Sequence, residues 1–271
     1  MAYPLEGITL RAHHKDSIDY LAGKLSLDPS ILAIIIAGSV AKGIAREDSD
    51  IDCYLVVSDE MFEEKKRQDQ LFYFAKEGCD YTGGYFDGKI IPYHFLEAAA
   101  LRGSEPTRAS FEKAFVAFSQ IPGVDDLVAK IPVYPEKNRE KNFQDFFAQV
   151  ELYGGYFANR AIETGNEYLL IYSIGQVTLF AGRLLLAYNR VLFPCHKSMM
   201  AVLRTLTHIP ERYFELQEDM LLNTNRETIR AFVECIRSFH AWGIAPHEAV
   251  SRFILNNEWN WLEDEPPLSD R

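Results

Sequence analysis

The chain has 271 residues, of which 48% are hydrophobic and 25% charged. This length and balance exclude general disorder and predict a folded protein of one large domain or two ordinary ones. The 39 Asp and Glu residues exceed the 28 Lys and Arg residues, so the formal charge is -11. Surplus acid repels phosphates, which disfavours non-specific nucleic-acid binding and suits cationic partners, although it also simply keeps a protein soluble.

The cysteines and the apolar runs indicate a compartment. Cys53, Cys79, Cys195 and Cys235 lie far apart, without a CxxC pair or a His cluster at zinc spacing, so we interpret them as free buried thiols. The longest apolar run, 31–37, is too short to span a bilayer. We therefore expect a cytoplasmic protein without membrane contact.

The first half of the chain predicts short helices and strands in alternation. Pro92 cannot donate a hydrogen bond to a sheet, so the strand that contains it should have an edge or a bulge there. Ser104 can cap the helix that GSEPTR opens. Apolar periodicity predicts helices over 13–29 and 59–77, strands over 31–37, 51–57 and 89–96, and a further helix from 103–108.

The second half has helical periodicity only, after a linker at 131–142 that contains two prolines and a charge run. We therefore predict an α+β protein: a first domain at 1–135 with a small mixed sheet flanked by helices, an all-α helical bundle at 138–262 and an acidic tail at 263–271. The predicted helical segments are 138–164, 167–191, 196–207, 210–222, 226–242 and 246–262.

The segment between the first two strands, AGSVAKGIAREDSDIDC, carries the chemistry. Gly38 lets the backbone approach a phosphate, and Ser39 offers a hydroxyl and an amide at the start of a short helix. Asp50 and Asp52 are two residues apart on a strand, so their side chains share one face. Paired carboxylates beside a phosphate site predict a seat for hard cations such as Mg²⁺. An ordinary tight turn followed by a capped loop is the alternative interpretation.

In combination these residues resemble the nucleotidyltransferase superfamily, which includes DNA polymerase beta and the kanamycin-type antibiotic-modifying enzymes. The shared pattern is an apolar strand, Gly-Ser, a short gap and an acid-apolar-acid strand, and Gly38, Ser39, Ser49, Asp50 and Asp52 stand at those places. The resemblance implies that Asp50 and Asp52 are catalytic and hold two Mg²⁺ ions that bridge the triphosphate of ATP. An acceptor hydroxyl would then attack the α-phosphate and release pyrophosphate.

The same resemblance indicates residues that contact the nucleotide. Ser39 would touch the outgoing phosphates, and Gly38 and Ser49 complete the motif around them. Lys42 is either a further phosphate contact or a solvated helix residue. Lys197, at a predicted helix start in AYNRVLFPCHKS, could reach the triphosphate from the second domain, with a solvated loop lysine as the alternative.

Many family members carry a third carboxylate on the next strand, where it binds metal or removes the proton of the acceptor. The predicted strand 89–96 contains no acid: Asp87 precedes it, Glu97 follows it, and Pro92 takes the expected place. His94 is a substitute base or a structural histidine. This departure leaves a weakened enzyme or a nucleotide-binding regulator as an alternative.

The helical half offers another candidate base. Glu151, in QVELYGGYFANRA, resembles the glutamate that kanamycin-type enzymes present near the acceptor hydroxyl, and a solvated helix glutamate is the alternative. Arg190 and His196 also fit the loose spacing of helical RNase toxins called HEPN. That pattern is permissive, and the negative charge of the chain argues against RNA.

The leading prediction is Mg²⁺-dependent transfer of a nucleoside monophosphate, AMP from ATP, to a hydroxyl of a small cationic acceptor such as an aminoglycoside. Transfer of AMP to a protein side chain is the second enzymatic reading. The expected partners are therefore a nucleoside triphosphate and a small molecule, and kanamycin-type relatives suggest a homodimer.

Overall fold

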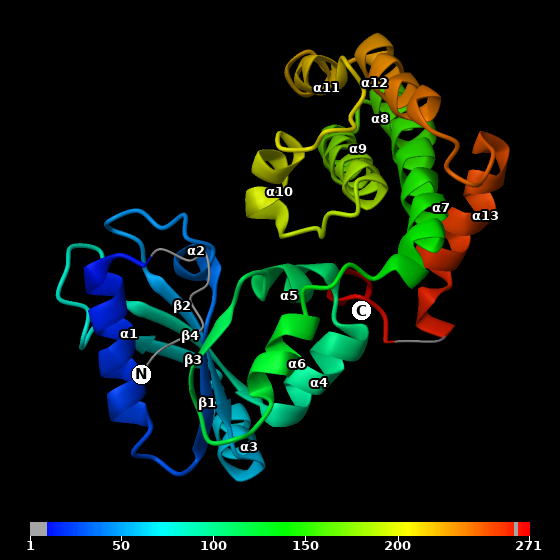
Figure 1. Cartoon of the computed structure of the whole chain (residues 1–271). Helices are drawn as coiled ribbons and strands as arrows, with labels where there is room; N and C mark the ends of the chain where they lie inside the picture. Colours follow the sequence, from blue (N-terminus) through cyan, green and yellow to red (C-terminus); the bar gives the residue numbers. More distant parts are fainter. Residues whose placement is uncertain (1–9, 263–264) are drawn as a thin grey trace. The chain divides into compact units, whose positions relative to one another are not determined.

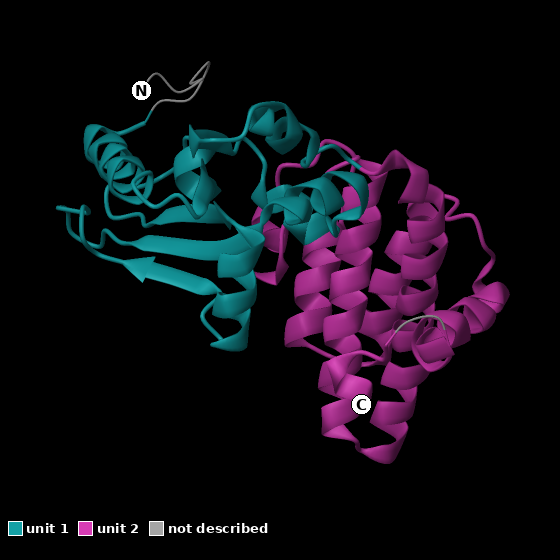
Figure 2. Ribbon diagram, turned by 90° about the horizontal axis from the view of Figure 1, so that it is seen from below, with its two compact units in different colours: residues 1–134 teal, residues 135–271 magenta. Residues whose placement is uncertain are grey.

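The structure is a computed structural model that describes residues 10–262 and 265–271. The chain forms two compact units, residues 1–134 and 135–271 (Figure 2). Each unit encloses hydrophobic clusters of its own. Glu263 and Asp264 of the predicted acidic tail lie outside the described residues.

Unit 1 is built on a mixed five-stranded sheet. Its strands are β1 (Ile31–Ile36), β2 (Ile51–Val57), β3 (Phe72–Ala75), β4 (Phe86–Pro92) and β5 (Phe115–Ser119). They lie in the order β3-β4-β2-β1-β5. β1 is antiparallel to both β2 and β5, β3 is antiparallel to β4, and β2 and β4 run parallel. The expected small mixed sheet is confirmed.

Helices cover both faces of this sheet (Figure 1). The helices of unit 1 are α1 (Ala12–Leu25), α2 (Gly38–Ala41), α3 (Asp59–Arg67), α4 (Tyr93–Arg102), α5 (Glu105–Ser110) and α6 (Val124–Lys130). α1 packs through Ile18 and Leu21 on one face, and α4 and α6 pack on the other, for example through Leu96 and Val128. The strands are apolar on both sides because both faces are buried.

The helix predicted over 59–77 is too long. Ser58 caps α3 by accepting a hydrogen bond from the Met61 amide at 3.3 Å, but the helix ends at Arg67. Asp69 then has a positive φ of 54°, which a helix cannot continue through. The chain returns as the edge strand β3, whose alternating Phe and Tyr residues are typical of a strand.

The strand predicted over 89–96 is also displaced. β4 begins at Phe86 and ends at Pro92, and Tyr93 starts α4. Gly88, which precedes the predicted strand, lies inside β4. A Cβ atom there would lie 2.9 Å from Cys53 Sγ and 3.0 Å from Tyr73 Cβ. Glycine at this position therefore reflects close packing against neighbouring strands rather than a turn.

Unit 2 is helical, and no strand occurs among its described residues. Its helices pack around a core that includes Phe147, Leu185 and Phe232. They are α7 (Arg139–Val150), α8 (Ala158–Thr164), α9 (Glu167–Tyr188), α10 (His196–Leu203), α11 (Tyr213–Leu222), α12 (Arg226–Phe239) and α13 (Ala249–Phe253), with π-helical segments η2 (Glu151–Phe157) and η4 (Ile254–Glu258) and short 3-10 turns η1 (Glu136–Asn138), η3 (Pro246–Glu248), η5 (Asn260–Leu262) and η6 (Leu268–Asp270).

Helix α9 is long and apolar enough to cross a membrane by length and composition alone. Its Val177, Ala181 and Leu184 are completely buried within the hydrophobic cluster of unit 2. Burial of this kind is typical of a central core helix, which has to be apolar on most sides.

Candidate active site

The turn between β1 and α2 places a carboxylate against a glycine. The Ala37 amide donates to the Asp52 carbonyl at 2.9 Å, which joins the end of β1 to β2. Gly38 has a φ of +63°, and a Cβ atom on it would lie 1.8 Å from Asp52 Oδ2. Both the backbone conformation and the close approach of Asp52 therefore require glycine here.

The parallel register of β2 and β4 brings a second carboxylate beside Asp52. Asp52 lies opposite Asp87, and Tyr54 lies opposite Lys89. Because directly opposite residues of paired strands share a face, these four side chains form a row. Asp50 stands directly before β2 and, two residues from Asp52, belongs to the same face.

This row lines a cavity of about 100 Å³ at the start of α2. Tyr54 Oη and Ser110 Oγ lie 2.8 Å apart, and Lys89 Nζ lies 5.4 Å from the centre of the Tyr54 ring. Lys42 donates to Glu112 Oε2 at 2.8 Å. The lining residues are Ala37, Gly38, Lys42, Asp52, Cys53, Tyr54, Asp87, Lys89 and Ser110.

Three predicted residues thus line one cavity: Gly38, Lys42 and Asp52. Ser39 is the second residue of α2, directly after Gly38. Tyr85, directly before β4, interacts with the Asp50 carboxylate: hydrogen bonding to this group, followed by its charge, raises the pKa of Tyr85. The Ile51 amide donates to the Tyr85 carbonyl at 3.0 Å, which fixes the two segments together.

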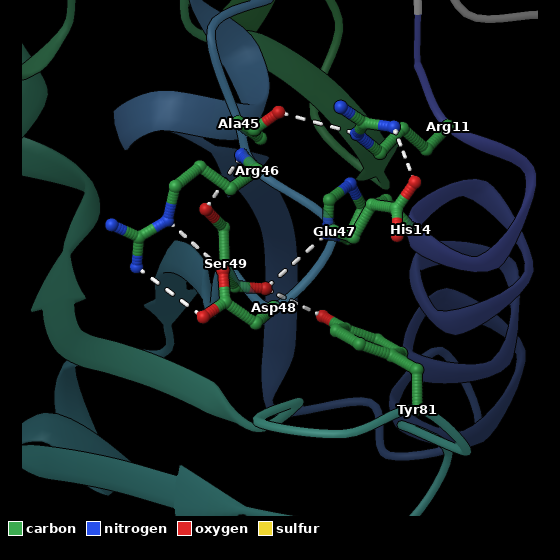
Figure 3. Close-up of polar contacts among 8 residues, drawn as sticks. All are labelled: Arg11, His14, Ala45, Arg46, Glu47, Asp48, Ser49 and Tyr81. Carbon is green, nitrogen blue, oxygen red and sulfur yellow. Dashed lines mark hydrogen bonds and ion pairs between the residues drawn. The ribbon is translucent and has the colours of Figure 1, made fainter.

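The loop that leads to Asp50 is fastened by Arg11 directly before α1, by His14 of α1 and by Tyr81 of the segment before β4 (Figure 3). Arg11 Nε donates to the Ala45 carbonyl at 3.2 Å. The Ser49 carbonyl accepts from Tyr81 Oη at 2.9 Å and lies 3.2 Å from His14 Nε2. Burial, followed by the neighbouring His13, lowers the pKa of His14. A neutral His14 can donate to this carbonyl only with its proton on Nε2.

Ser49 was predicted to bind nucleotide, and the structure gives its hydroxyl a local partner. Ser49 Oγ accepts a hydrogen bond from the Arg46 amide at 2.9 Å. This bond closes the loop on itself, as short polar side chains commonly do in turns. A contact between Ser49 and nucleotide stays a prediction.

The cavity also contains a thiol. Burial, followed by the charges of Asp52 and Asp87, raises the pKa of Cys53 to about 12. Cys53 therefore stays protonated near neutral pH and lacks the thiolate character of a reactive cysteine.

The candidate metal ligands at this site are carboxylate oxygens. Within residues 10–262 and 265–271, no group of three or more His, Cys, Asp or Glu side chains is arranged to hold a metal ion. Mg²⁺, however, typically takes one or two protein carboxylates and completes its shell with water and substrate phosphates. Asp52 and Asp87, which stand opposite each other on the adjacent strands β2 and β4, fit that mode of binding.

The prediction of a strand without an acid is wrong, because β4 contains Asp87. It lies inside β4, opposite Asp52, whereas Pro92 is the last residue of that strand. His94 is not on the strand face: it lies on α4 with a side chain 69% exposed, and its Nδ1 is 3.9 Å from Asp59 Oδ1. Sequence reasoning missed Asp87 because Asp-Gly is a strong turn signal, although the alternation of Phe86, Gly88 and Ile90 with polar residues could have revealed the strand.

The two remaining predicted residues belong to unit 2. Glu151, the first residue of η2, is buried. Arg237 of α12 holds its carboxylate with two hydrogen bonds, Nε to Oε1 at 3.1 Å and Nη2 to Oε2 at 2.8 Å. Lys197 is the exposed second residue of α10. Their roles toward a nucleotide stay predictions.

Comparison with known proteins gives one family match and a similar solved structure. Residues 18–84 match the family described as nucleotidyltransferase domain. The crystal structure of a nucleotidyltransferase-like protein from Exiguobacterium sibiricum 255-15 has a similar fold, with a TM-score of 0.50 and 12% sequence identity, over 94% of this chain and 81% of that one. No curated protein matches the chain. Residues 18–84 are therefore similar to a nucleotidyltransferase domain, and the family match ends just before the strand that carries Asp87.

Proposed function

We propose that the chain transfers a nucleoside monophosphate, AMP from ATP, to a hydroxyl group in a Mg²⁺-dependent reaction that releases pyrophosphate. The observation that carries this proposal is the placement of Asp87 opposite Asp52, with Gly38 in contact with the Asp52 carboxylate. Paired carboxylates beside a backbone turn that can approach phosphates suit phosphoryl chemistry. The family match over residues 18–84 supports the same reaction class.

The residues of the site would have different roles in this reaction. Asp50, Asp52 and Asp87 would hold Mg²⁺, which when bound neutralises and orients the triphosphate. Gly38 and Ser39 leave room for the phosphates at the start of α2. Asp87 is also our candidate for the group that takes the proton of the acceptor, because a general base must lie within reach of that hydroxyl.

Glu151 is the alternative base, and its surroundings weaken that role. The two hydrogen bonds from Arg237 occupy both of its carboxylate oxygens. A carboxylate engaged in this way by a guanidinium has little room to accept a further hydrogen bond from an acceptor hydroxyl. We therefore favour Asp87.

Our proposal for the acceptor is based on the net charge of the chain. The chain carries a formal charge of -11, which favours association with a small cationic molecule such as an aminoglycoside. Transfer of AMP to a protein side chain is the second candidate. The alternative of a nucleotide-binding regulator without turnover was based on a strand that lacks a third carboxylate. Because Asp87 lies in β4, that basis is removed.

The test is pyrophosphate release from ATP and Mg²⁺ in the presence of a panel of aminoglycosides, and separately of a protein extract followed by mass spectrometry. We expect release with at least one aminoglycoside. Mass shifts on extract proteins without release on the panel would move the acceptor to the protein class. The absence of pyrophosphate release with every acceptor would reject nucleotidyl transfer.

Variants then test the site. Asp52→Asn and Asp87→Asn should each reduce turnover at least about 100-fold, as expected for loss of a metal ligand or of a general base. Asp80→Asn is the matched control, because Asp80 is an exposed acid in the loop before β4 and should keep the wild-type rate. A near-normal rate for Asp87→Asn would contradict the role that we give to this residue.

A further inference from the structure

A larger cavity, of about 590 Å³, lies within the helical unit, between η2 and α8 on one side and α12 on the other. A volume of this size is in the range of small-molecule sites. The residues that line it are Gly154, Gly155, Asn159, Arg226, Glu227, Arg230, Val233 and Arg237.

Two glycines in η2 shape the cavity in different ways. A Cβ atom at Gly154 would lie 2.5 Å from Val233 Cγ2, so the absence of a side chain lets η2 and α12 pack closely. A Cβ atom at Gly155 would meet nothing within 4 Å, so this residue faces open space. Asn159 Nδ2 donates to the Gly155 carbonyl at 2.7 Å. Irregular π-helical turns such as η2 are rare and are frequently found at functional sites.

Cationic side chains from one face of α12 line one side of this cavity. Arg226, Arg230 and Arg237 follow one another at helical spacing, with Val233 between them. The chain as a whole has a formal charge of -11, so a cavity lined by three arginines differs in charge from the rest of the molecule. Glu227 is the acid among the lining residues.

Two of these arginines are held in place by carboxylates. Arg226 Nη2 lies 2.9 Å from Glu163 Oε1, and Arg237 forms ion pairs with Glu151 at 2.8 Å and with Glu234 at 2.6 Å.

Arg230 differs from its neighbours. It is exposed, and over the described part of the chain it makes no hydrogen bond or ion pair. A guanidinium presents a fork of donors that matches a carboxylate or a phosphate group with two parallel hydrogen bonds. The unpaired arginine at the cavity is therefore available to an anionic ligand.

We propose that this cavity binds a small molecule with a carboxylate or phosphate group, which pairs with Arg230 between Arg226 and Arg237. This site belongs to unit 2 alone and goes beyond nucleotidyl transfer. Its ligand is recognised by negative charge, whereas the acceptor proposed for the transfer reaction is cationic.

The test uses the full chain without divalent cations or nucleotide, so that the carboxylate site of unit 1 does not contribute. Protein with ¹⁵N-labelled arginine is titrated separately with inorganic phosphate and with succinate, and the Nε–H signals are followed by NMR. We expect saturable shifts of the Arg230 signal, assigned by its loss in Arg230→Gln. Binding of phosphate, of succinate or of both supports the proposal and tells the two ligand classes apart.

Two variants decide whether the cavity is responsible. Arg230→Gln should weaken anion binding at least about 10-fold, as expected for loss of a charge-assisted hydrogen-bonded pair. Arg212→Gln is the charge-matched control, because Arg212 pairs with Glu215 in the same unit and does not line the cavity. Its affinity should equal that of the wild type.

Gly155→Leu tests the space without removing a charge. The leucine side chain would extend into the cavity and should abolish binding, while the melting temperature should stay the same or rise, because leucine favours a helix more than glycine does. A wild-type chain that binds neither anion at millimolar concentration would overturn the proposal. So would unchanged affinity in both Arg230→Gln and Gly155→Leu.

Discussion

Gly38 illustrates at the scale of one residue how the fold shapes the site. Its φ is +63°, and a Cβ atom would collide with the Asp52 carboxylate at 1.8 Å. We expect Gly38→Ala to lower the free energy of unfolding by more than about 1 kcal/mol, the usual cost of a left-handed conformation for a residue other than glycine. Because Asp52 must move, nucleotidyl transfer should also fall sharply, as pyrophosphate release would show.

Gly43→Ala is the control that separates these two effects. Gly43 also has a positive φ, of +71°, but a Cβ atom there would meet nothing within 4 Å. This variant should therefore lose a similar amount of stability in urea unfolding and keep its activity. Equal activity of the Gly38 and Gly43 variants would show that the contact with Asp52 does not position that carboxylate.

His14 makes stability depend on pH. Its pKa is lowered from 6.5, mainly by burial and then by His13, although its bond to the Ser49 carbonyl raises it. The unfolded chain therefore takes up the proton before the folded chain does. The contribution of His14 to stability is constant above about pH 6.5 and is lost as the pH falls from there toward the folded pKa.

The prediction concerns the fall in the free energy of unfolding between pH 7.5 and pH 5.5, measured by urea denaturation. The fall should be smaller for His14→Gln, which cannot titrate, than for the wild type. His247→Gln, which replaces an exposed histidine, should behave like the wild type. A wild-type fall equal to that of His14→Gln would show that this histidine is not the titrating group.

At the scale of elements, the sequence predicted those strands and helix caps that are determined by residues close together in the chain. The strands predicted over 31–37 and 51–57 became β1 and β2, and Ser104 does cap α5 by accepting a hydrogen bond from the Thr107 amide. These features follow from residues close together in the chain. The placement of Asp50 and Asp52 before and within β2 was therefore predictable.

What could not be predicted depends on neighbours that are distant in sequence. Asp87 and Gly88 look like a turn until β2 and β3 are packed on either side of them, because glycine inside a strand is explained only by the Cys53 and Tyr73 side chains that it accommodates. The register that sets Asp87 opposite Asp52 is likewise a tertiary property. The position of Asp87 inside a strand, opposite Asp52, was hidden for this reason.

Arg108 of α5 joins the ends of two helices. It is 5% exposed. Its guanidinium donates to the Gly103 and Ala100 carbonyls at the end of α4, at 2.9 and 3.0 Å, and to the Ile131 carbonyl after α6, at 2.9 Å. Helix ends leave carbonyls without partners inside the helix, and this one side chain satisfies several of them.

We therefore expect Arg108→Met to lower the free energy of unfolding by at least about 2 kcal/mol, because methionine keeps apolar bulk but leaves buried carbonyls unpaired. Arg102→Met removes the same charge from an exposed position at the end of α4 and should change stability by less than about 0.5 kcal/mol. Urea denaturation measures both. A similar small change in the two variants would mean that water replaces the guanidinium without cost.

At the scale of the whole molecule, each unit has a complete core. The two hydrophobic clusters of the first unit are made of residues from 10–131, and the cluster of the second unit is made of residues from 143–253. Cores that share no member do not need each other for the burial of apolar surface, which is the main stabilising term in folding. The chain divides between residues 134 and 135.

We therefore expect fragments 1–134 and 135–271, expressed separately, each to unfold cooperatively in urea when followed by circular dichroism. The fragment 1–134 contains Gly38, Asp52 and Asp87 and should bind ATP with Mg²⁺, and Asp52→Asn in that fragment should weaken this binding. The fragment 135–271 should keep the arginine-lined cavity and its anion binding. A fragment without a cooperative transition would show that its unit depends on contacts with the rest of the chain, because a complete core alone would then be insufficient for folding.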